Sequence, residues 1–218
     1  PQDRSSAASD VYKRQENAAT TVASTISIAS KFQIKFFATG GIGGVHLNVE
    51  NTNDVSADLY ALSENSNFVI CSGAKSILDL SKTNELLETL GITRIGYQTN
   101  YMPGFWYEET ENKVDNRFDE IHEISSFLKL NENIENKKSI LIFNKVPLNK
   151  ALNKNDVEKW INNAAIKADR NNISGKELTP FLIKEINEES KNETLNANTS
   201  LIINNANLAG KIAKNFYS

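Results

Sequence analysis

Three short segments of this 218-residue chain combine residue types that could do chemistry. The first, TGGIGGVH at residues 39–46, has four glycines, which let backbone N–H groups approach an anion closely. The second, NDVSAD at residues 53–58, holds two aspartates four residues apart, which would lie on one side of a helical turn. The third, SGAK at residues 72–75, ends in a lysine soon after an apolar run.

Lys75 is the candidate nucleophile. It follows the apolar run at 68–71 where a helix is expected to start, so desolvation and the positive end of the helix dipole would both lower the pKa of its amine. A neutral amine can attack a carbonyl carbon and form an imine. A solvent-facing lysine is the commoner case, but the strand-end position and the small flanking residues favour a functional one.

The other two segments each have an ordinary structural explanation beside the functional one. The glycine loop lacks the Gly-Lys-Ser/Thr of a P-loop, and His46 stands where a dinucleotide fingerprint has its third glycine. A tight turn therefore explains the loop as well as a ligand does, and a lone His46 is more often a hydrogen-bonded structural residue. Asp54 and Asp58 could hold a divalent cation through oxygen or move protons, but helix capping is the more usual role.

Strand and helix signals alternate along the chain. Short apolar runs predict buried strands at 34–38, 68–71, 92–97, 139–143 and 201–203. Helical periodicity predicts helices at 17–31, from 56 toward 62, and at 83–90, 117–130, 155–169, 176–189 and 206–216. The alternation predicts a three-layer α/β/α sandwich around a mostly parallel or mixed sheet. In such sheets ligands collect beyond the carboxyl ends of the strands, so the functional segments are expected there.

Composition limits the partners. Hydrophobic residues make up 39% of the chain, enough for a packed core. With 24 Lys and Arg against 27 Asp and Glu, the net charge of −3 gives no general attraction to nucleic acid or to an anionic membrane. No apolar run approaches the roughly 20 residues that cross a bilayer. A single cysteine, Cys71, excludes an internal disulfide. We expect a soluble cytoplasmic protein without nucleic-acid or membrane partners.

The first sixteen residues, PQDRSSAASDVYKRQE, differ from the rest of the chain. They are polar, lack an apolar period or a secretory hydrophobic region, and end abruptly at the first predicted helix. We expect residues 1–16 to be a non-native leader or a disordered tail. Residues 17–218 are expected to form one α/β domain.

Several sequence blocks, in order from about residue 17 to the C-terminus, resemble the pseudouridine-5′-phosphate glycosidases, also called indigoidine synthase A-like proteins. The blocks are TTVAST (20–25), TGGIGGVH (39–46), DVSADL (54–59), CSGAKSILD (71–79), GYQT (96–99), GKE (175–177), TPF (179–181) and NNA (204–206). The resemblance implies a homotrimer of α/β/α subunits. It also implies reversible cleavage of the C–C glycosidic bond of pseudouridine 5′-phosphate, giving uracil and ribose 5-phosphate.

The resemblance further implies residue roles. Lys75 matches the lysine that forms an imine with the opened sugar, Asp54 the aspartate that binds Mn²⁺, and Asn198 an active-site asparagine. Asp58 is also a candidate for moving protons. The matches that bind substrate or line the pocket are Val22, Thr39, His46, Ser56, Ala57 and Asp58. An imine suits this bond, because a C-glycoside has no heteroatom leaving group and an imine provides an electron sink.

The resemblance also shows one departure from the family. Complete members begin with a Glu-Ser-Thr motif, whose glutamate is the general acid, followed later by a substrate-binding lysine, and neither is present here. We therefore expect the C-terminal part of such an enzyme, slowed by about two to four orders of magnitude without its acid. Two alternatives stay open: a non-catalytic nucleotide- or phosphate-binding module, and a Schiff-base aldolase acting on another sugar phosphate.

Overall fold

The structure is a computed structural model that describes residues 20–134 and 137–218. The segment expected to be a leader, residues 1–16, lies outside the described residues. Within the described ranges, no helix is long and apolar enough to cross a membrane.

The centre of the fold is a parallel sheet of five strands in the order β1-β2-β5-β3-β4. The strands are β1 (Phe36–Ala38), β2 (Phe68–Cys71), β3 (Thr93–Tyr97), β4 (Asn116–Phe118) and β5 (Ile140–Phe143). The last strand in the sequence, β5, lies in the middle, where Leu141 pairs with both Val69 and Arg94. Every residue of β2 and β5 is buried, as expected for strands covered on both faces.

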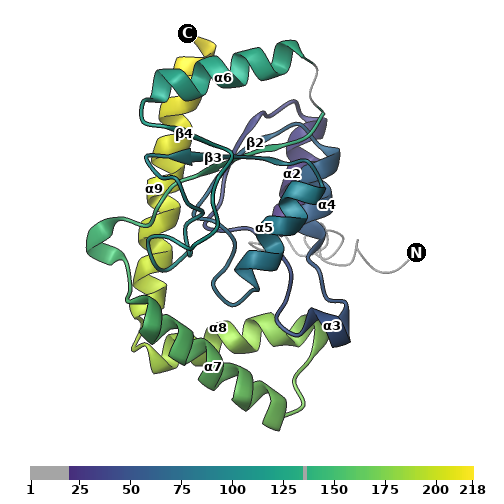
Figure 1. Ribbon diagram of the computed structural model, residues 1–218, viewed down its shortest axis with the longest axis vertical. Coiled ribbons are helices and arrows are strands. Elements are labelled where there is room, and N and C mark those ends of the chain that lie inside the picture. The colour runs from purple at the N-terminus through teal and green to yellow at the C-terminus, as the bar shows by residue number, and fades with distance from the viewer. Residues whose placement is uncertain (1–19, 135–136) are drawn as a thin grey trace, which may run out of the picture.

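Helices cover both faces of this sheet, and alternate side chains of β2 show which helices lie on which face. Val69 and Cys71 belong to the core shared with α2 (Val22–Lys31), α4 (Ala57–Glu64) and α5 (Leu80–Thr89). Phe68 and Ile70 belong to the core shared with α6 (Ile121–Asn133) and α9 (Glu193–Tyr217). Figure 1 shows α9 to the left of the strands and α2, α4 and α5 to their right. The expected α/β/α sandwich is confirmed, with a wholly parallel sheet.

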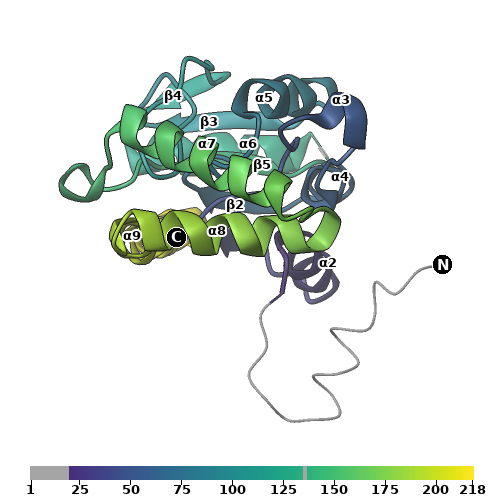
Figure 2. The ribbon, with the colours of Figure 1, turned by 90° about the horizontal axis from the view of Figure 1, so that it is seen from below.

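The remaining helices lie outside these layers. They are α3 (Val49–Thr52), α7 (Lys154–Arg170), α8 (Leu178–Glu189) and two 3₁₀ turns, η1 (Leu148–Lys150) and η2 (Gly175–Glu177). Helices α7 and α8 pack against each other beyond one end of the sheet (Figures 1 and 2). Pro180 lies in the first turn of α8, where the missing N–H costs nothing.

The predicted strand at 201–203 is wrong. Helix α9 runs without a break from Glu193 to Tyr217, and its buried residues recur at helical spacing. Leu201 is fully buried, whereas Ile202 and Ile203 are 46% and 56% exposed. A run of three apolar residues occurs both in short strands and on helices with a wide apolar face. Here the helical spacing of the buried residues along the whole of α9 determines the structure.

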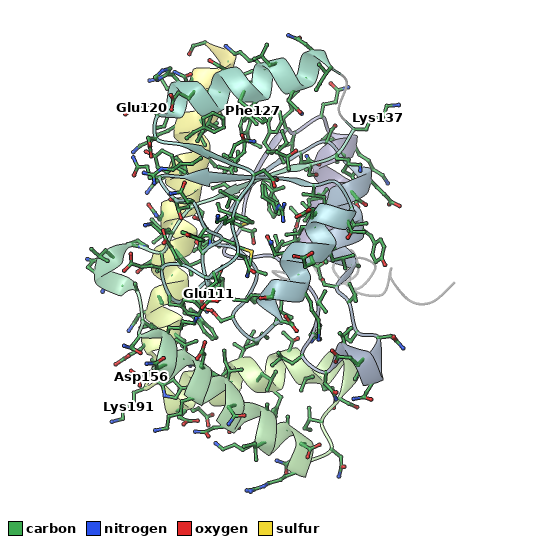
Figure 3. The ribbon with its side chains drawn as sticks, viewed as in Figure 1. Glu111, Glu120, Phe127, Lys137, Asp156 and Lys191 are labelled. Carbon is green, nitrogen blue, oxygen red and sulfur yellow. The ribbon has the colours of Figure 1, made fainter. Side chains whose placement is uncertain are left out.

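Two further expectations fail at element boundaries. Residues 117–118 belong to the edge strand β4, and α6 starts only at Ile121, just after Glu120, which Figure 3 labels. There the Glu123 carboxylate accepts a 3.1 Å hydrogen bond from the Glu120 N–H. The segment after Cys71 contains a single hydrogen-bonded turn, in which the Leu78 N–H donates to the Lys75 carbonyl at 3.0 Å, but no helix: α5 starts at Leu80, with Asp79 as its N-cap. Lys75 therefore lies in a loop rather than at a helix start.

The finding that residues 201–203 are helical can be tested by measuring the free energy of unfolding of two variants. We expect Leu201→Ala to lower the free energy of unfolding by about 2–5 kcal/mol, because it empties a fully buried site. We expect Ile203→Ala to change it by less than about 0.5 kcal/mol, because that side chain is largely exposed. In a strand both side chains would share one face, so equal losses on urea unfolding would contradict the helix.

Candidate active site

The glycine loop and the lysine segment run side by side beyond the carboxyl ends of β1 and β2. The Ser72 N–H donates to the Gly40 carbonyl at 2.8 Å, and the Lys75 N–H donates to the Ile42 carbonyl at 3.1 Å. Between them, the Ile42 N–H donates to the Gly73 carbonyl at 3.1 Å. The parallel pairing of the two strands thus continues past the sheet, and it brings two of the predicted segments into one site.

The glycines allow other segments to pack closely against this pair. A Cβ atom on Gly43 would lie 2.2 Å from the Ser56 Oγ, so only glycine lets the NDVSAD segment approach. Gly73 has a φ of +83°, and a Cβ there would lie 2.2 Å from the Pro103 carbonyl oxygen. The NDVSAD segment and the loop around residue 103 therefore both contact the glycine-rich backbone.

A cleft of about 310 Å³ opens among these segments. It brings together six of the predicted site residues: Val22, Thr39, His46, Ser56, Asp58 and Lys75. Six side-chain-bearing residues that were not predicted as site residues also line it: Thr20, Thr21, Ile77, Leu78, Phe105 and Thr179. The three threonines lie in sequence blocks that carry the resemblance, whereas no sequence signal pointed to Phe105.

Lys75 is half-buried on the wall of this cleft. Within residues 20–134 and 137–218, its ammonium group makes no hydrogen bond or ion pair. The prediction that Lys75 lies at the positive end of a helix dipole is wrong, because the next helix along the chain, α5, starts five residues later. The fold places this lysine in the cleft without a carboxylate partner among residues 20–134 and 137–218.

Cys71, four residues earlier, does not compete with this amine as a nucleophile. Burial raises the pKa of its thiol to about 12, although a backbone hydrogen bond from Gly73 opposes the shift. The fully buried thiol therefore stays protonated at neutral pH, and a protonated thiol is a poor nucleophile.

Asp58 is a buried clamp. Its carboxylate is 6% exposed, with Oδ1 accepting from the Ala23 N–H at 2.8 Å and Oδ2 from the Gly43 N–H at 2.7 Å. It thereby ties the first turn of α2 to the glycine loop, while Ser56 caps α4 by accepting from the Asp58 N–H. With both oxygens bonded to backbone donors, this carboxylate is built to position the cleft walls rather than to carry protons.

Asp54 lies next to the cleft and not in it. It lines an adjoining cavity of about 600 Å³, and His46 and Thr179 line both spaces. The His46 Nδ1 is 3.7 Å from the Asp54 Oδ2. Among the described residues no group of three His, Cys, Asp or Glu could hold a metal ion. A cation here would have one carboxylate ligand and need water or substrate oxygens for the rest.

The last two predicted residues do not line the cleft either. Ala57 is exposed in the first turn of α4. The Asn198 Oδ1 accepts a 2.7 Å hydrogen bond from the indole N–H of Trp106, a buried residue whose ring packs 5.4 Å from that of Phe105. Phe105 lines the cleft with a φ of +67°, a backbone conformation that bulky residues rarely adopt. Asn198 thus supports the cleft wall through Trp106.

A paired substitution tests the role of Asp58. We expect Asp58→Asn to lower the free energy of unfolding by about 1–3 kcal/mol, because its new NH₂ group would face a backbone N–H donor. Asp54→Asn, at a half-exposed carboxylate, should change it by less than about 0.5 kcal/mol. If Asp58→Asn is as stable as the unmodified chain in urea unfolding, the clamp assignment is wrong.

The chain is similar to known proteins over most of its length. The family model described as indigoidine synthase A like protein matches residues 5–215. The chain is 46% identical over 200 residues to a pseudouridine-5′-phosphate glycosidase from Petrotoga mobilis, covering 92% of this chain and 65% of the relative. A second enzyme of that name, from Kosmotoga olearia, is 46% identical over 199 residues, covering 91% of this chain and 68% of the relative.

A solved structure shows the same fold. The prealnumycin C-glycosynthase in complex with ribulose 5-phosphate aligns with a TM-score of 0.85 at 33% identity, over 91% of this chain and 65% of that one. This chain therefore spans about two thirds of the length of the relatives it matches. The matched residues, the sequence identity and the shared fold together show that the chain belongs to the indigoidine synthase A like family.

Proposed function

We propose that this chain takes part in the reversible cleavage of pseudouridine 5′-phosphate to uracil and ribose 5-phosphate, with Lys75 forming an imine with the opened sugar. The observation that carries the proposal is the placement of Lys75, without an ionic partner among the described residues, in the cleft beside the glycine loop. The names of the relatives support the substrate, and the complex of a similar protein with ribulose 5-phosphate supports a sugar phosphate in such a fold.

The cleft has backbone donors for the phosphate group of this substrate. In the described part of the chain, the N–H groups of Gly40 and Gly41 have no hydrogen-bond partner, and both residues line the cleft. The threonines at the start of α2, Thr20 and Thr21, line the same space. Unpaired N–H groups and a helix N-terminus are the usual protein environment for a bound phosphate.

The chemistry is simplest in the direction of synthesis. The Lys75 amine adds to the aldehyde carbon of open-chain ribose 5-phosphate and expels water, which gives an imine. That carbon accepts an electron pair from C5 of uracil, so the C–C bond forms while the C=N electron pair moves to the nitrogen, and the proton lost from C5 ends on that nitrogen. Closure of the sugar ring then expels the Lys75 amine, and cleavage is the same sequence reversed.

We further propose that Asp54 holds Mn²⁺ as a largely hydrated ion beside the cleft. A single carboxylate with water is a usual environment for a hard divalent cation, and Asp54 is partly exposed. When bound, the ion would supply positive charge for orienting water and substrate oxygens. A homotrimer in the cytoplasm completes the proposal. The exposed apolar side chains of Ile28 and Phe32 on and just after α2 favour an assembled form.

Borohydride trapping tests the imine. We expect ribose 5-phosphate plus borohydride to add one sugar to Lys75, located by peptide mass spectrometry, and Lys75→Ala to reduce the labelling at least about tenfold. Lys145→Ala is the control, because Lys145 is paired with Glu109 at 3.2 Å and lies outside the cleft. Labelling that persists in Lys75→Ala would refute the nucleophile.

The same trapping experiment, together with product analysis, distinguishes the proposed enzyme from the two alternatives. A phosphate-binding module would bind ribose 5-phosphate without any labelling of Lys75. An aldolase would form the imine but would make no product from uracil, whereas the proposed enzyme forms pseudouridine 5′-phosphate from uracil and ribose 5-phosphate, detected by liquid chromatography.

Manganese binding is tested without reference to activity. We expect the electron paramagnetic resonance signal of free Mn²⁺ to fall on adding the chain, and Asp54→Asn to weaken binding about tenfold or more, because it removes the one charged ligand. Asp169→Asn, at an exposed aspartate in the last turn of α7, should bind like the unmodified chain. Equal binding by all three proteins would place the ion elsewhere.

A further inference from the structure

One face of α9 contacts the floor of the cleft. Asn198, Leu201 and Asn205 are spaced at three and four residues, so they lie on the same side of the helix. Asn198 holds Trp106, and a Cβ atom on Gly40 would lie 3.0 Å from the Leu201 Cδ1. Asn205 is fully buried.

Asn205 joins the carboxyl ends of three strands. Its Nδ2 donates to the carbonyl oxygens of Thr39 at 2.8 Å and Gly40 at 3.3 Å, and it lies 3.1 Å from the Ser72 Oγ. Its Oδ1 accepts from the Asn144 Nδ2 at 3.0 Å. Because backbone carbonyls only accept hydrogen bonds, the NH₂ end of the amide must face Thr39 and Gly40. These contacts reach the residues that follow β1, β2 and β5.

The two carbonyls held by Asn205 fix the direction of two N–H groups. In a trans peptide the C=O and the following N–H point in opposite directions. The Thr39 carbonyl shares its peptide with the Gly40 N–H, and the Gly40 carbonyl shares its peptide with the Gly41 N–H. Both N–H groups therefore point away from Asn205, and they are the same two that lack a partner among the described residues.

We propose that Asn205 is a positioning residue of the cleft, which turns the N–H groups of Gly40 and Gly41 toward an anionic oxygen of the bound sugar phosphate. The proposal rests on the function proposed above, which supplies ribose 5-phosphate as the ligand. Asn205 does not touch the ligand itself. It acts through two peptide groups, in a buried site where its own donors and acceptor are all satisfied.

The first experiment reads the two N–H groups directly in the unmodified chain. With ¹⁵N-glycine labelling the chain has ten glycine signals, which glycine substitutions assign. On titration with inorganic phosphate and with ribose 5-phosphate, we expect the Gly40 and Gly41 amide signals to shift, and those of Gly91 and Gly210, which do not line the cleft or the adjoining cavity, to stay. A titration in which ribose 5-phosphate binds but Gly40 and Gly41 do not move overturns the proposal.

The second experiment compares two matched substitutions. Asn205→Asp replaces the NH₂ that faces two carbonyls with an oxygen that cannot donate. Asn67→Asp makes the same change at a buried asparagine just before β2, at the amino end of the sheet, where Nδ2 donates to the Ile34 carbonyl at 2.7 Å. Both should lower stability, but only Asn205 lies at the cleft, so Asn67→Asp controls for the loss of a buried hydrogen bond.

The readout is the preference for a phosphorylated sugar. For each variant, the half-saturating concentrations of ribose and of ribose 5-phosphate are measured by borohydride trapping at Lys75. We expect Asn205→Asp to reduce the preference for ribose 5-phosphate about tenfold or more, and Asn67→Asp to leave it within about twofold, because charge-assisted hydrogen bonds are lost only in the former. Equal preferences in the two variants would overturn the proposal.

Results that contradict the proposed function differ from results that contradict the role of Asn205. If neither sugar labels Lys75 in the unmodified chain, the imine is wrong, while the glycine signals still report whether phosphate meets Gly40 and Gly41. If Asn205→Asp does not fold, the glycine titration of the unmodified chain decides the matter alone.

Discussion

The Ser72 and Lys75 N–H groups donate to the Gly40 and Ile42 carbonyls, so the pairing of β1 with β2 continues into the loops beyond the sheet. This continuation places the lysine, the glycine loop and the cleft between them. A parallel pair normally separates where its strands end, since each strand leads into its own crossover helix. Here the glycines let residues 40–42 and 72–75 stay in contact, and α5 starts only at Leu80.

Two buried polar side chains hold the glycine loop from opposite helical layers. Asp58, on the α2 and α4 side, accepts a hydrogen bond from the Gly43 N–H, and Asn205, on the α9 side, donates to the Thr39 and Gly40 carbonyls. An acidic side chain meets a backbone donor and an amide meets backbone acceptors, so each buried group is satisfied. The loop is thus held by hydrogen bonds from both sides, which suits the anion site proposed for its backbone N–H groups.

The geometry also separates residues that touch the cleft from residues that support it. Lys75, Thr39 and Val22 line the cleft, as the resemblance implies. Asn198 reaches it only through Trp106 and Phe105, and Asp54 lies on the far side of His46. Matching a residue to a family position therefore identified side chains that lie in or beside one cleft, and their contacts distinguish those that line it from those that support it.

The sequence by itself determined the layered α/β class, the strand at 68–71, the position of Lys75 after it, and the family resemblance. These depend on local patterns: an apolar run, helical periodicity and short blocks of identical residues. The sequence could not show that 201–203 is helical, because three apolar residues carry no period of their own. Only the tertiary structure decided that Asn205 contacts Thr39, 166 positions away in the chain, and that both carboxylate oxygens of Asp58 accept from backbone donors. Such pairings depend on how the strand order brings distant loops to one edge of the sheet, and no local pattern encodes that.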